Sequence, residues 1–281
     1  MDFFYLNKDL RENSQSPVFT IHNRSFKYGD GFFESIRIIN GKVLFWDKHY
    51  ERLLSSLNVL QLNIDTISLS AIEEQLNTLI SKKNITDGGR ARITFYREGE
   101  GMYAPQINNA NYIIEAYPLE NNLFELNKKG LLVDLYTDFK KPLNTLSNIK
   151  TNNCLTYVLA SVYKNNKQLD DCILLNDNGN IAEATSSNLF IVVNGTLYTP
   201  PLSEGCLNGV MRKVLLENAK KNGINVYEKE LKPSDILGAD ELFITSTVRG
   251  INWVGFYKNR RYFNNVSKKL IDILNSMATT N

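Results

Sequence analysis

Three short segments of the chain contain residue types that could do chemistry. The first, residues 147–153, reads Ser-Asn-Ile-Lys-Thr-Asn-Asn and is a polar loop ahead of an apolar helix. A lysine in a desolvated pocket can act as a nucleophile and form a Schiff base. Because the chain is rich in lysine, Lys150 taken alone is better explained as a solvated surface residue.

The second segment, residues 206–212, reads Cys-Leu-Asn-Gly-Val-Met-Arg and enters a predicted helix. Asn208 can cap this helix, and Gly209 lets the backbone approach a ligand. The exposed N–H groups of the first helical turn suit a phosphate group. An ordinary capped helix explains the same pattern, and without further observations it is the favoured interpretation.

The third candidate is Glu183, which lies in the predicted strand that begins at Ile181. Alternation along a strand can place Glu183 on the same face as Ile181. A carboxylate that faces a core needs a proton or a cationic partner to offset its desolvation. On an edge strand the same side chain is simply solvated, and the spacing leaves both alternatives open.

The elements before residue 118 are predicted from periodicity and turn residues. Residues 32–39 and 42–46 flank Asn40-Gly41, which predicts a β-hairpin on a type I′ turn. We expect Asp47 to cap a helix. Two helical stripes follow, one formed by Tyr50, Leu53, Leu54, Leu57 and Leu60 and the other by Leu69, Ile72, Leu76, Leu79 and Ile80. Strands at residues 91–96 and 112–117 complete this part.

The polar segment at residues 118–122 predicts a domain boundary, which we place between residues 118 and 119. The domains are therefore residues 1–118 and 119–281. For the second domain we expect a β-meander between residues 172 and 199 and a helix with the apolar stripe Leu155, Val158, Leu159 and Val162. The remaining elements expected there are strands at 131–136, 225–228 and 241–245, a helix at 210–222 and a terminal helix from 266. Without regular βαβ alternation, this order predicts an α+β fold.

The composition excludes several classes of protein. Hydrophobic residues make up 43% and charged residues 22%, which is typical of a chain with a real core. The net charge of +2 gives no electrostatic reason to expect nucleic acid or an anionic membrane as partner. The apolar runs are short and the start lacks a signal-peptide layout, so we expect a cytoplasmic protein. With only His22 and His49, a metal site is hard to build and none is predicted.

Taken together and in order, these segments resemble the class IV aminotransferase family, which has fold type IV among pyridoxal-phosphate enzymes. The resemblance runs from Tyr28-Gly29-Asp30-Gly31-Phe32-Phe33-Glu34 to Ile244-Thr245-Ser246-Thr247. It covers nearly the whole chain. It implies a smaller N-terminal α/β domain and a larger C-terminal domain with a β-barrel-like core, which would carry the Schiff-base lysine.

The resemblance also implies roles for single residues. Lys150 would bind pyridoxal 5′-phosphate as a Schiff base and move the substrate proton, and Glu183 would pair with the pyridine nitrogen. Arg52 resembles the arginine that grips the cofactor phosphate. The backbone of Val210 and Met211 would complete the phosphate cup. Thr247 would reach the phosphate through its hydroxyl, while neighbouring N–H groups, including that of Val248, would face the substrate carboxylate.

The reaction is less clearly indicated. Leu155 stands where branched-chain aminotransferases usually have a tyrosine, and Phe33 where D-amino-acid aminotransferases have a substrate-binding tyrosine. Leu155 and Arg249-Gly250 look more like aminodeoxychorismate lyase, although Met102 stands near where lyases often have an arginine. The leading hypothesis is therefore pyruvate elimination to give 4-aminobenzoate, with Arg97 or Arg249 binding a substrate carboxylate. The alternatives are an amino-acid transaminase of the D-amino-acid or branched-chain type and a non-catalytic binding module.

The resemblance finally implies partners. Members of the family generally work as homodimers on small amine or amino-acid substrates. The loop at residues 96–103 would then close the site of a neighbouring subunit. Gly99 and Gly101 in this loop fit a mobile connection.

Overall fold

The computed structural model describes residues 3–12, 17–63 and 68–280. The chain forms two compact units. The first unit comprises residues 1–123 and 149–153, and the second comprises residues 124–148 and 154–281. The predicted boundary at residues 118/119 lies close to this division. The segment that carries Lys150, however, belongs to the first unit and not to the C-terminal one as expected.

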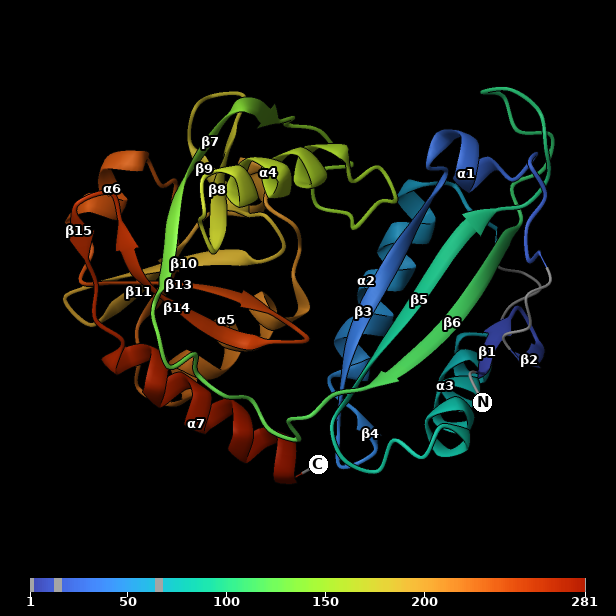
Figure 1. Cartoon of the computed structure of the whole chain (residues 1–281), viewed down its shortest axis with the longest axis horizontal. Coiled ribbons are helices and arrows are strands. Elements are labelled where there is room, and N and C mark those ends of the chain that lie inside the picture. The colour runs from blue at the N-terminus through green and yellow to red at the C-terminus, as the bar shows by residue number, and fades with distance from the viewer. Residues whose placement is uncertain (1–2, 13–16, 64–67, 281) are drawn as a thin grey trace. The chain divides into compact units, whose positions relative to one another are not determined.

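The first unit is built on a six-stranded sheet with the strand order β2-β1-β6-β5-β3-β4 (Figure 1). Its strands are β1 (Phe3–Leu6), β2 (Asp9–Glu12), β3 (Gly31–Ile39), β4 (Lys42–Val43), β5 (Gly89–Arg97) and β6 (Ala110–Pro118). Its helices are α1 (Arg24–Tyr28), α2 (Trp46–Val59) and α3 (Leu69–Lys82).

The core of the first unit lies between the sheet and the apolar sides of α2 and α3. Phe32 and Ile36 of β3 and Phe95 of β5 belong to this core, because alternate residues of a strand share a face. All five residues of the stripe predicted for α3 are buried in it, which confirms that helix. The opposite face of the sheet carries the residues in between, among them Phe33 and Arg92, which are half-buried.

The predicted hairpin is confirmed at its turn, where both Asn40 and Gly41 have positive φ angles, as a type I′ turn requires. The second strand is shorter than expected, because α2 begins at Trp46. Asp47 is not the N-cap, so that prediction is wrong. Phe45, in the left-handed conformation, occupies the cap position, and Asp47 lies in the first turn, where its charge favours the helix dipole.

The second unit contains a nine-stranded sheet in which eight strands follow the order β12-β11-β10-β13-β14-β7-β8-β9, while β15 pairs with β14. Its strands are β7 (Leu131–Lys141), β8 (Asp171–Asn176), β9 (Ile181–Ala184), β10 (Asn188–Val193), β11 (Thr196–Thr199), β12 (Val226–Glu228), β13 (Glu241–Ser246), β14 (Gly250–Tyr257) and β15 (Arg260–Arg261). Its helices are α4 (Leu155–Asn166), η1 (Leu202–Glu204), α5 (Val210–Lys221), α6 (Pro233–Gly238) and α7 (Asn265–Thr280).

The sheet of the second unit curls. Only three residues connect β9, at one end of the strand order, to β10, which is third from the other end. The two strands can be so close only if the sheet bends round, which agrees with the predicted barrel-like core. The predicted meander is wrong in one respect. A meander would pair β9 with β10. Instead, β9 pairs with β8 at the end of the order, and β10 lies between β11 and β13.

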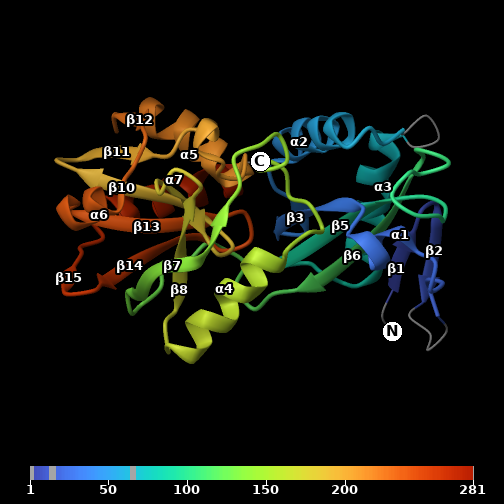
Figure 2. The ribbon, with the colours of Figure 1, turned by 90° about the horizontal axis from the view of Figure 1, so that it is seen from above.

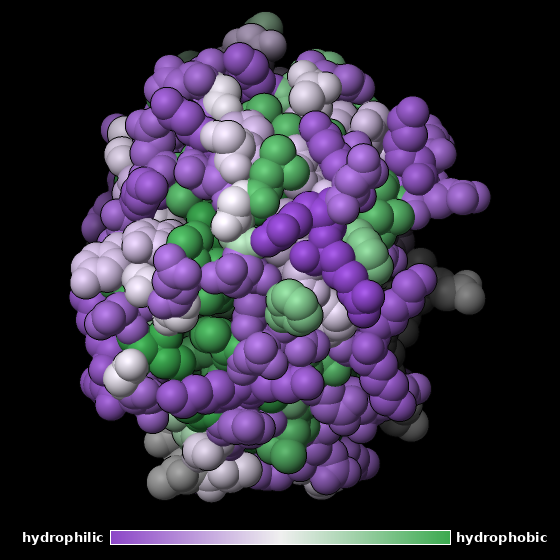
Figure 3. All heavy atoms as spheres, turned by 90° about the vertical axis from the view of Figure 1, so that its left-hand side faces the viewer, coloured by the Kyte–Doolittle hydropathy of each residue, from purple (hydrophilic) through white to green (hydrophobic). Residues whose placement is uncertain are grey.

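Helix α4 differs from the prediction in the side that it buries. Its apolar stripe is exposed, with 74% of Leu155 and 50% of Val162 open to solvent, whereas Ala160 is buried. Figure 2 shows α4 in side view, running along the margin of the second unit. Another face of this unit is mainly hydrophilic, with apolar groups between the polar ones (Figure 3). No helix among the described residues is long and apolar enough to span a membrane.

Candidate active site

The segment that carries Lys150 is pinned to the start of β3 by backbone hydrogen bonds. The Phe33 N–H donates to the Lys150 carbonyl at 2.9 Å, and the Asn152 N–H donates to the Gly31 carbonyl at 2.9 Å. Thr151 forms an antiparallel bridge with Phe32 between these two bonds. The backbone of this loop lysine is therefore fixed by the same kind of pairing that fixes a strand residue.

Two side chains and one glycine secure the same segment. The Asn152 amide donates to the Ser25 hydroxyl at 3.1 Å, and the Asn153 amide donates to the Gly29 carbonyl at 3.3 Å. A Cβ atom on Gly31 would lie 2.1 Å from the Phe95 carbonyl oxygen and 2.7 Å from the Asn152 amide nitrogen. Gly31 is therefore required for the close approach of these strands.

The ammonium group of Lys150 lies against Phe33, with its Nζ atom 4.6 Å from the ring centroid. The Arg92 guanidinium lies against the same ring, with Cζ 3.6 Å from the centroid. Arg92 Nε also donates to the Thr94 hydroxyl at 3.0 Å. Sequence reasoning missed Arg92, because the alternation of residues 90–94 alone indicates only a solvent-facing side of the strand.

Arg52 and Glu34 form a buried ion pair on the core side of β3. Arg52 Nε donates to Glu34 Oε1 at 2.7 Å, Arg52 Nη2 contacts Oε2, and His49 Nδ1 lies 2.7 Å from Oε2. Burial alone would raise the pKa of Glu34, but the charge of Arg52 and hydrogen bonds from His49 and Arg52 hold it at about 2. Burial lowers the pKa of His49, against the opposing effect of Glu34.

The pairing with Glu34 limits what Arg52 can do for a ligand. Two of its guanidinium nitrogens, Nε and Nη2, are directed at the carboxylate. A phosphate contact by Arg52 would therefore use N–H groups of its guanidinium other than those directed at Glu34. Glu34 would orient the guanidinium for such a contact, as supporting hydrogen bonds do in many binding sites.

Arg97 is committed to the structure of the first unit. Its Nε donates to Asp30, Nη1 to the Asn108 side chain at 2.7 Å and to the Gln61 carbonyl, and Nη2 to the Leu60 carbonyl at 2.7 Å. All of its nitrogens have protein acceptors. This geometry favours a structural role for Arg97 over binding of a substrate carboxylate.

The loop after β5 is tied down by Arg24. This buried side chain pairs with Asp30 and donates to the carbonyl groups of Glu100, Met102 and Tyr103. The side chains of Met102 and Tyr103 are themselves exposed. The loop is thus anchored through its backbone, while its side chains remain available for contacts.

In the second unit, Glu183 is an inward-facing carboxylate with 3% of its surface exposed. Its Oε1 accepts hydrogen bonds from Lys141 Nζ and from the Tyr157 hydroxyl, the latter at 2.7 Å. Its Oε2 accepts from the Leu207 N–H at 2.8 Å. The structure therefore selects the first of the two alternatives that the spacing left open, a buried carboxylate with a cationic partner.

Sequence reasoning missed both Lys141 and Tyr157. Lys141 ends β7 and is itself buried, so its charge is offset by Glu183. Burial and the charge of Glu183 raise the pKa of Tyr157, so its hydroxyl stays protonated and donates. A lysine five residues beyond the predicted strand at 131–136 gives no signal that it will meet a glutamate 42 positions later.

The start of α5 has no side-chain cap. The N-cap is Gly209 and not Asn208, so that detail of the prediction is wrong. A Cβ on Gly209 would lie 1.9 Å from Asn188 Oδ1, which explains why glycine stands there. Without a capping side chain, the first-turn N–H groups of Val210 and Met211 keep the polarity that favours an anion.

Contacts through Asn188 place the start of α5 near the turn that carries Thr247. The Asn188 amide donates to the Leu207 carbonyl at 2.8 Å, and Asn188 pairs with Thr245 across β10 and β13. Thr247 is buried in the following turn, Val248 is half-buried and Arg249 is exposed. The second unit therefore brings Glu183, the start of α5 and this turn to one region.

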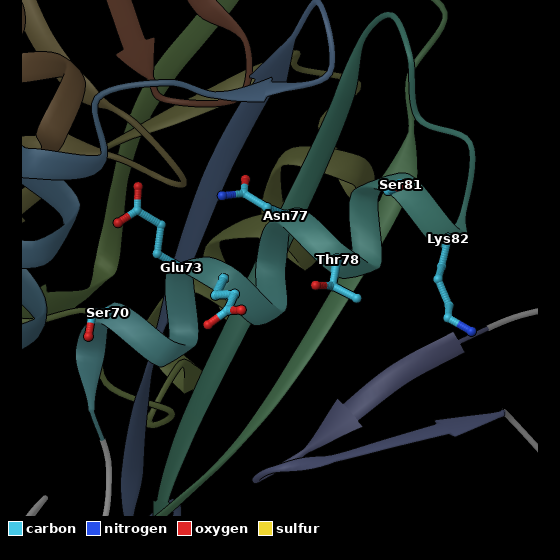
Figure 4. Close-up of a pocket in the computed structure, with 7 residues that line it drawn as sticks. Ser70, Glu73, Asn77, Thr78, Ser81 and Lys82 are labelled. Carbon is cyan, nitrogen blue, oxygen red and sulfur yellow. The ribbon is translucent and has the colours of Figure 1, made fainter.

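A hollow along α3 is a weaker candidate. It is lined by Ser70, Glu73, Glu74, Asn77, Thr78, Ser81 and Lys82 (Figure 4). These side chains come from the outer side of one helix, and Lys82 points away from the other labelled groups. None of the residues that motifs singled out lines this hollow, and we assign it no function.

Comparisons with known proteins agree on one family. The model of the amino-transferase class IV family matches residues 31–254. A Methanocaldococcus jannaschii protein with the provisional name branched-chain-amino-acid aminotransferase is 31% identical, over 98% of this chain and 96% of its own length. The D-alanine aminotransferase of Bacillus licheniformis is 30% identical, over 86% of this chain and 83% of its own length.

Solved structures support the same conclusion. A Legionella pneumophila crystal structure, provisionally assigned as a 4-amino-4-deoxychorismate lyase, is 28% identical with a TM-score of 0.82. It covers 95% of this chain and 97% of that one. The family resemblance and the mixed helix-and-strand fold predicted from the sequence are thereby confirmed.

The ion pair around Glu34 should make the stability of the folded chain depend on pH. The pKa of Glu34 is about 2 in the folded chain against an ordinary 4.5, so the unfolded chain binds the proton first as pH falls. The stability from this pair is complete above pH 4.5 and is lost towards pH 2. When the pH falls from 5 to 2.5, the free energy of unfolding measured in urea should decrease by about 2 kcal/mol more in the wild type than in Glu34→Gln.

The control for this measurement is Glu74→Gln, which changes an exposed glutamate on α3. Its stability should follow the wild type over the whole pH range. Equal slopes for wild type and Glu34→Gln would contradict the ion pair.

Proposed function

Because this chain belongs to the class IV aminotransferase family, whose enzymes depend on pyridoxal 5′-phosphate, we propose that it transfers the amino group of a small amino acid to a keto acid. The observation that carries the proposal is the placement of Lys150. Its backbone is pinned to β3 and its amine lies against Phe33. A lysine held at a fixed place in this way can act as a nucleophile towards an aldehyde.

The residues of the second unit fit the cofactor. Glu183 is a buried acceptor with a supporting cation, and it would pair with the pyridine nitrogen. The N–H groups of Val210 and Met211, at the uncapped start of α5, would bind the phosphate, with the Thr247 hydroxyl beside them. Arg52 would add a positive charge for the phosphate. When bound, pyridoxal 5′-phosphate supplies an electron sink for charge at the substrate Cα.

Lys150 has two proposed tasks. Its amine would first hold the cofactor as a Schiff base. Lys150 would also serve as general base and acid, moving a proton between the substrate Cα and C4′ of the cofactor. Both tasks need an amine at a fixed position, and the half-buried side chain against Phe33 provides one.

The neighbours of Glu183 would keep its carboxylate ready to accept a hydrogen bond from the pyridine N–H. Lys141 offsets its charge, and the hydroxyl of Tyr157 and the N–H of Leu207 hold its oxygens in place. A carboxylate fixed in this way needs little reorganisation when a pyridine N–H approaches. Lys141 and Tyr157 are therefore positioning residues.

Aminodeoxychorismate lyase is the second candidate. Leu155 and Arg249-Gly250 favour it, and so does the resemblance to the Legionella structure. Two observations favour the transaminase instead. The Methanocaldococcus jannaschii and Bacillus licheniformis relatives, at 31% and 30% identity, have aminotransferase names. Arg97, which the lyase hypothesis used as a carboxylate clamp, is engaged by protein acceptors.

We also propose that the protein is a homodimer through α4. Leu155, Val158, Leu159 and Val162 form an apolar stripe on the solvent side of this helix. Residues spaced three and four apart share a helix face, and such a face is normally covered by another surface. A second copy of the chain would cover it. The exposed Met102 and Tyr103 of the Arg24-anchored loop are available to the partner.

Lys150→Ala tests the cofactor assignment. Borohydride reduction of the wild type with added pyridoxal 5′-phosphate should trap close to one cofactor per chain, and the variant should trap none. Lys140→Ala, which removes an exposed lysine of β7, should behave like the wild type. Cofactor trapped on Lys150→Ala at the wild-type ratio would exclude Lys150, and an uncoloured wild type would favour the non-catalytic module.

Acceptor dependence separates the two reactions. The cofactor-loaded protein should convert more than one equivalent of D-alanine or L-leucine per chain only when 2-oxoglutarate is present, because the amino group taken up by the cofactor then needs a carbonyl acceptor. The lyase would instead release pyruvate from aminodeoxychorismate, generated with chorismate, glutamine and an amidotransferase, without any keto acid. Pyruvate release of that kind, with no turnover of either amino acid, would overturn the transaminase proposal.

Val158→Glu tests the dimer. A buried negative charge in an apolar contact is unfavourable, so the variant should elute with half the wild-type mass in light-scattering chromatography. Leu237→Glu, a similarly exposed leucine on α6, should leave the mass unchanged. A wild-type monomer, or an unchanged dimer in Val158→Glu, would show that α4 is not the interface.

A further inference from the structure

Phe33 is contacted by two cations from different parts of the first unit. Lys150 Nζ lies 4.6 Å and Arg92 Cζ lies 3.6 Å from its ring centroid, so the two charged groups are at most about 8 Å apart. The aromatic face attracts each cation, which helps to hold both near one point. Their mutual repulsion is relieved when an anion binds beside them.

The sheet register explains why Arg92 reaches this point. Ser35 of β3 is opposite Arg92, and Phe33 is opposite Thr94. Phe33 is thus the diagonal neighbour of Arg92 on the same face, within reach of a long side chain. The hydrogen bond from Arg92 Nε to the Thr94 hydroxyl orients the guanidinium plane.

Two charged residues, Glu115 and Arg90, are neighbours of Arg92 in the sheet. Glu115 of β6 is opposite Arg92 on the other side of β5 and accepts a hydrogen bond from the Tyr117 hydroxyl at 2.7 Å. The guanidinium of Arg92 lies over Phe33, on the β3 side. Arg90, two residues earlier on the same face, stacks on Tyr117 with Cζ 5.0 Å from the ring centroid.

We propose that Arg92 binds the carboxylate of the substrate whose amino group reacts at Lys150. This inference rests on the proposed function and names the residue that recognises the substrate class. In an amino acid the carboxylate oxygens lie about 3 Å from the amine nitrogen. A bidentate contact to a guanidinium adds about 4 Å to Cζ, so both groups fit within the span between Lys150 and Arg92.

Arg92 replaces the two arginines expected from the sequence. Arg97 is engaged by Asp30, Asn108 and two carbonyl groups. Arg249 is exposed in the turn after β13. Arg92 has the planar fork that recognises a carboxylate, and among these three arginines it alone contacts the ring that Lys150 contacts.

The test compares substrates with and without a carboxylate. Cofactor-loaded wild type, Arg92→Met and Arg92→Lys are titrated with D-alanine and L-leucine, and with the matching amines ethylamine and 3-methylbutylamine, by following the visible cofactor band. Arg92→Met should weaken the response to the amino acids about ten-fold or more, because a charged hydrogen-bonded contact is lost. Its response to the amines should be unchanged. Arg92→Lys should be intermediate, since it keeps charge but not the fork.

Arg90→Met is the matched control, because it removes an arginine from the same strand and face. It should behave like the wild type with all four compounds. Equal weakening of amines and amino acids in Arg92→Met, or no weakening at all, would overturn the inference.

The proposed function fails in a different way. In that case the wild type itself would trap no cofactor with borohydride. Loss of cofactor trapping in Arg92→Met and Arg92→Lys, with wild-type thermal unfolding, would assign Arg92 to the cofactor and so also overturn the inference.

Discussion

The backbone pairing of residues 149–153 with the start of β3 is the constraint on which the candidate site depends. Two hydrogen bonds, from the Phe33 N–H to Lys150 and from the Asn152 N–H to Gly31, convert a polar loop into a short extension of the sheet. The pairing needs a residue without Cβ at Gly31. Because a paired strand directs alternate side chains to opposite faces, the pairing also decides which way the lysine points. The direction of the Lys150 side chain is therefore set by main-chain geometry before any side-chain contact is considered.

Two buried carboxylates are stabilised by the same means in the two units. Glu34 has Arg52 and His49, and Glu183 has Lys141 and the Tyr157 hydroxyl. In each case a cation offsets desolvation and a second donor satisfies the remaining acceptor capacity. The two carboxylates differ in what they do. Glu34 orients an arginine, whereas Glu183 is itself the group proposed to meet the cofactor.

Local pattern predicted most elements, and long-range pairing explains the failures. The stripe of α3 was readable because its five apolar residues all face one core. The stripe of α4 has the same periodicity, yet it faces solvent, since periodicity reports a face and not what covers it. Lys150 and Glu183 can be singled out as candidates because their motifs occur in order along the chain. Arg92 and Lys141 depend on strand register and on a partner far along the chain, which short segments do not encode.

The tether between Arg24 and the loop after β5 has a consequence for how this protein can change over generations. Arg24 holds carbonyl oxygens, which every amino acid possesses, and not particular side chains. Substitutions at Met102 or Tyr103 can therefore alter what the loop touches without releasing it from its support. A loop fastened in this manner is free to diversify in chemistry while it keeps its path, so preference for different molecules can evolve there at little risk to folding.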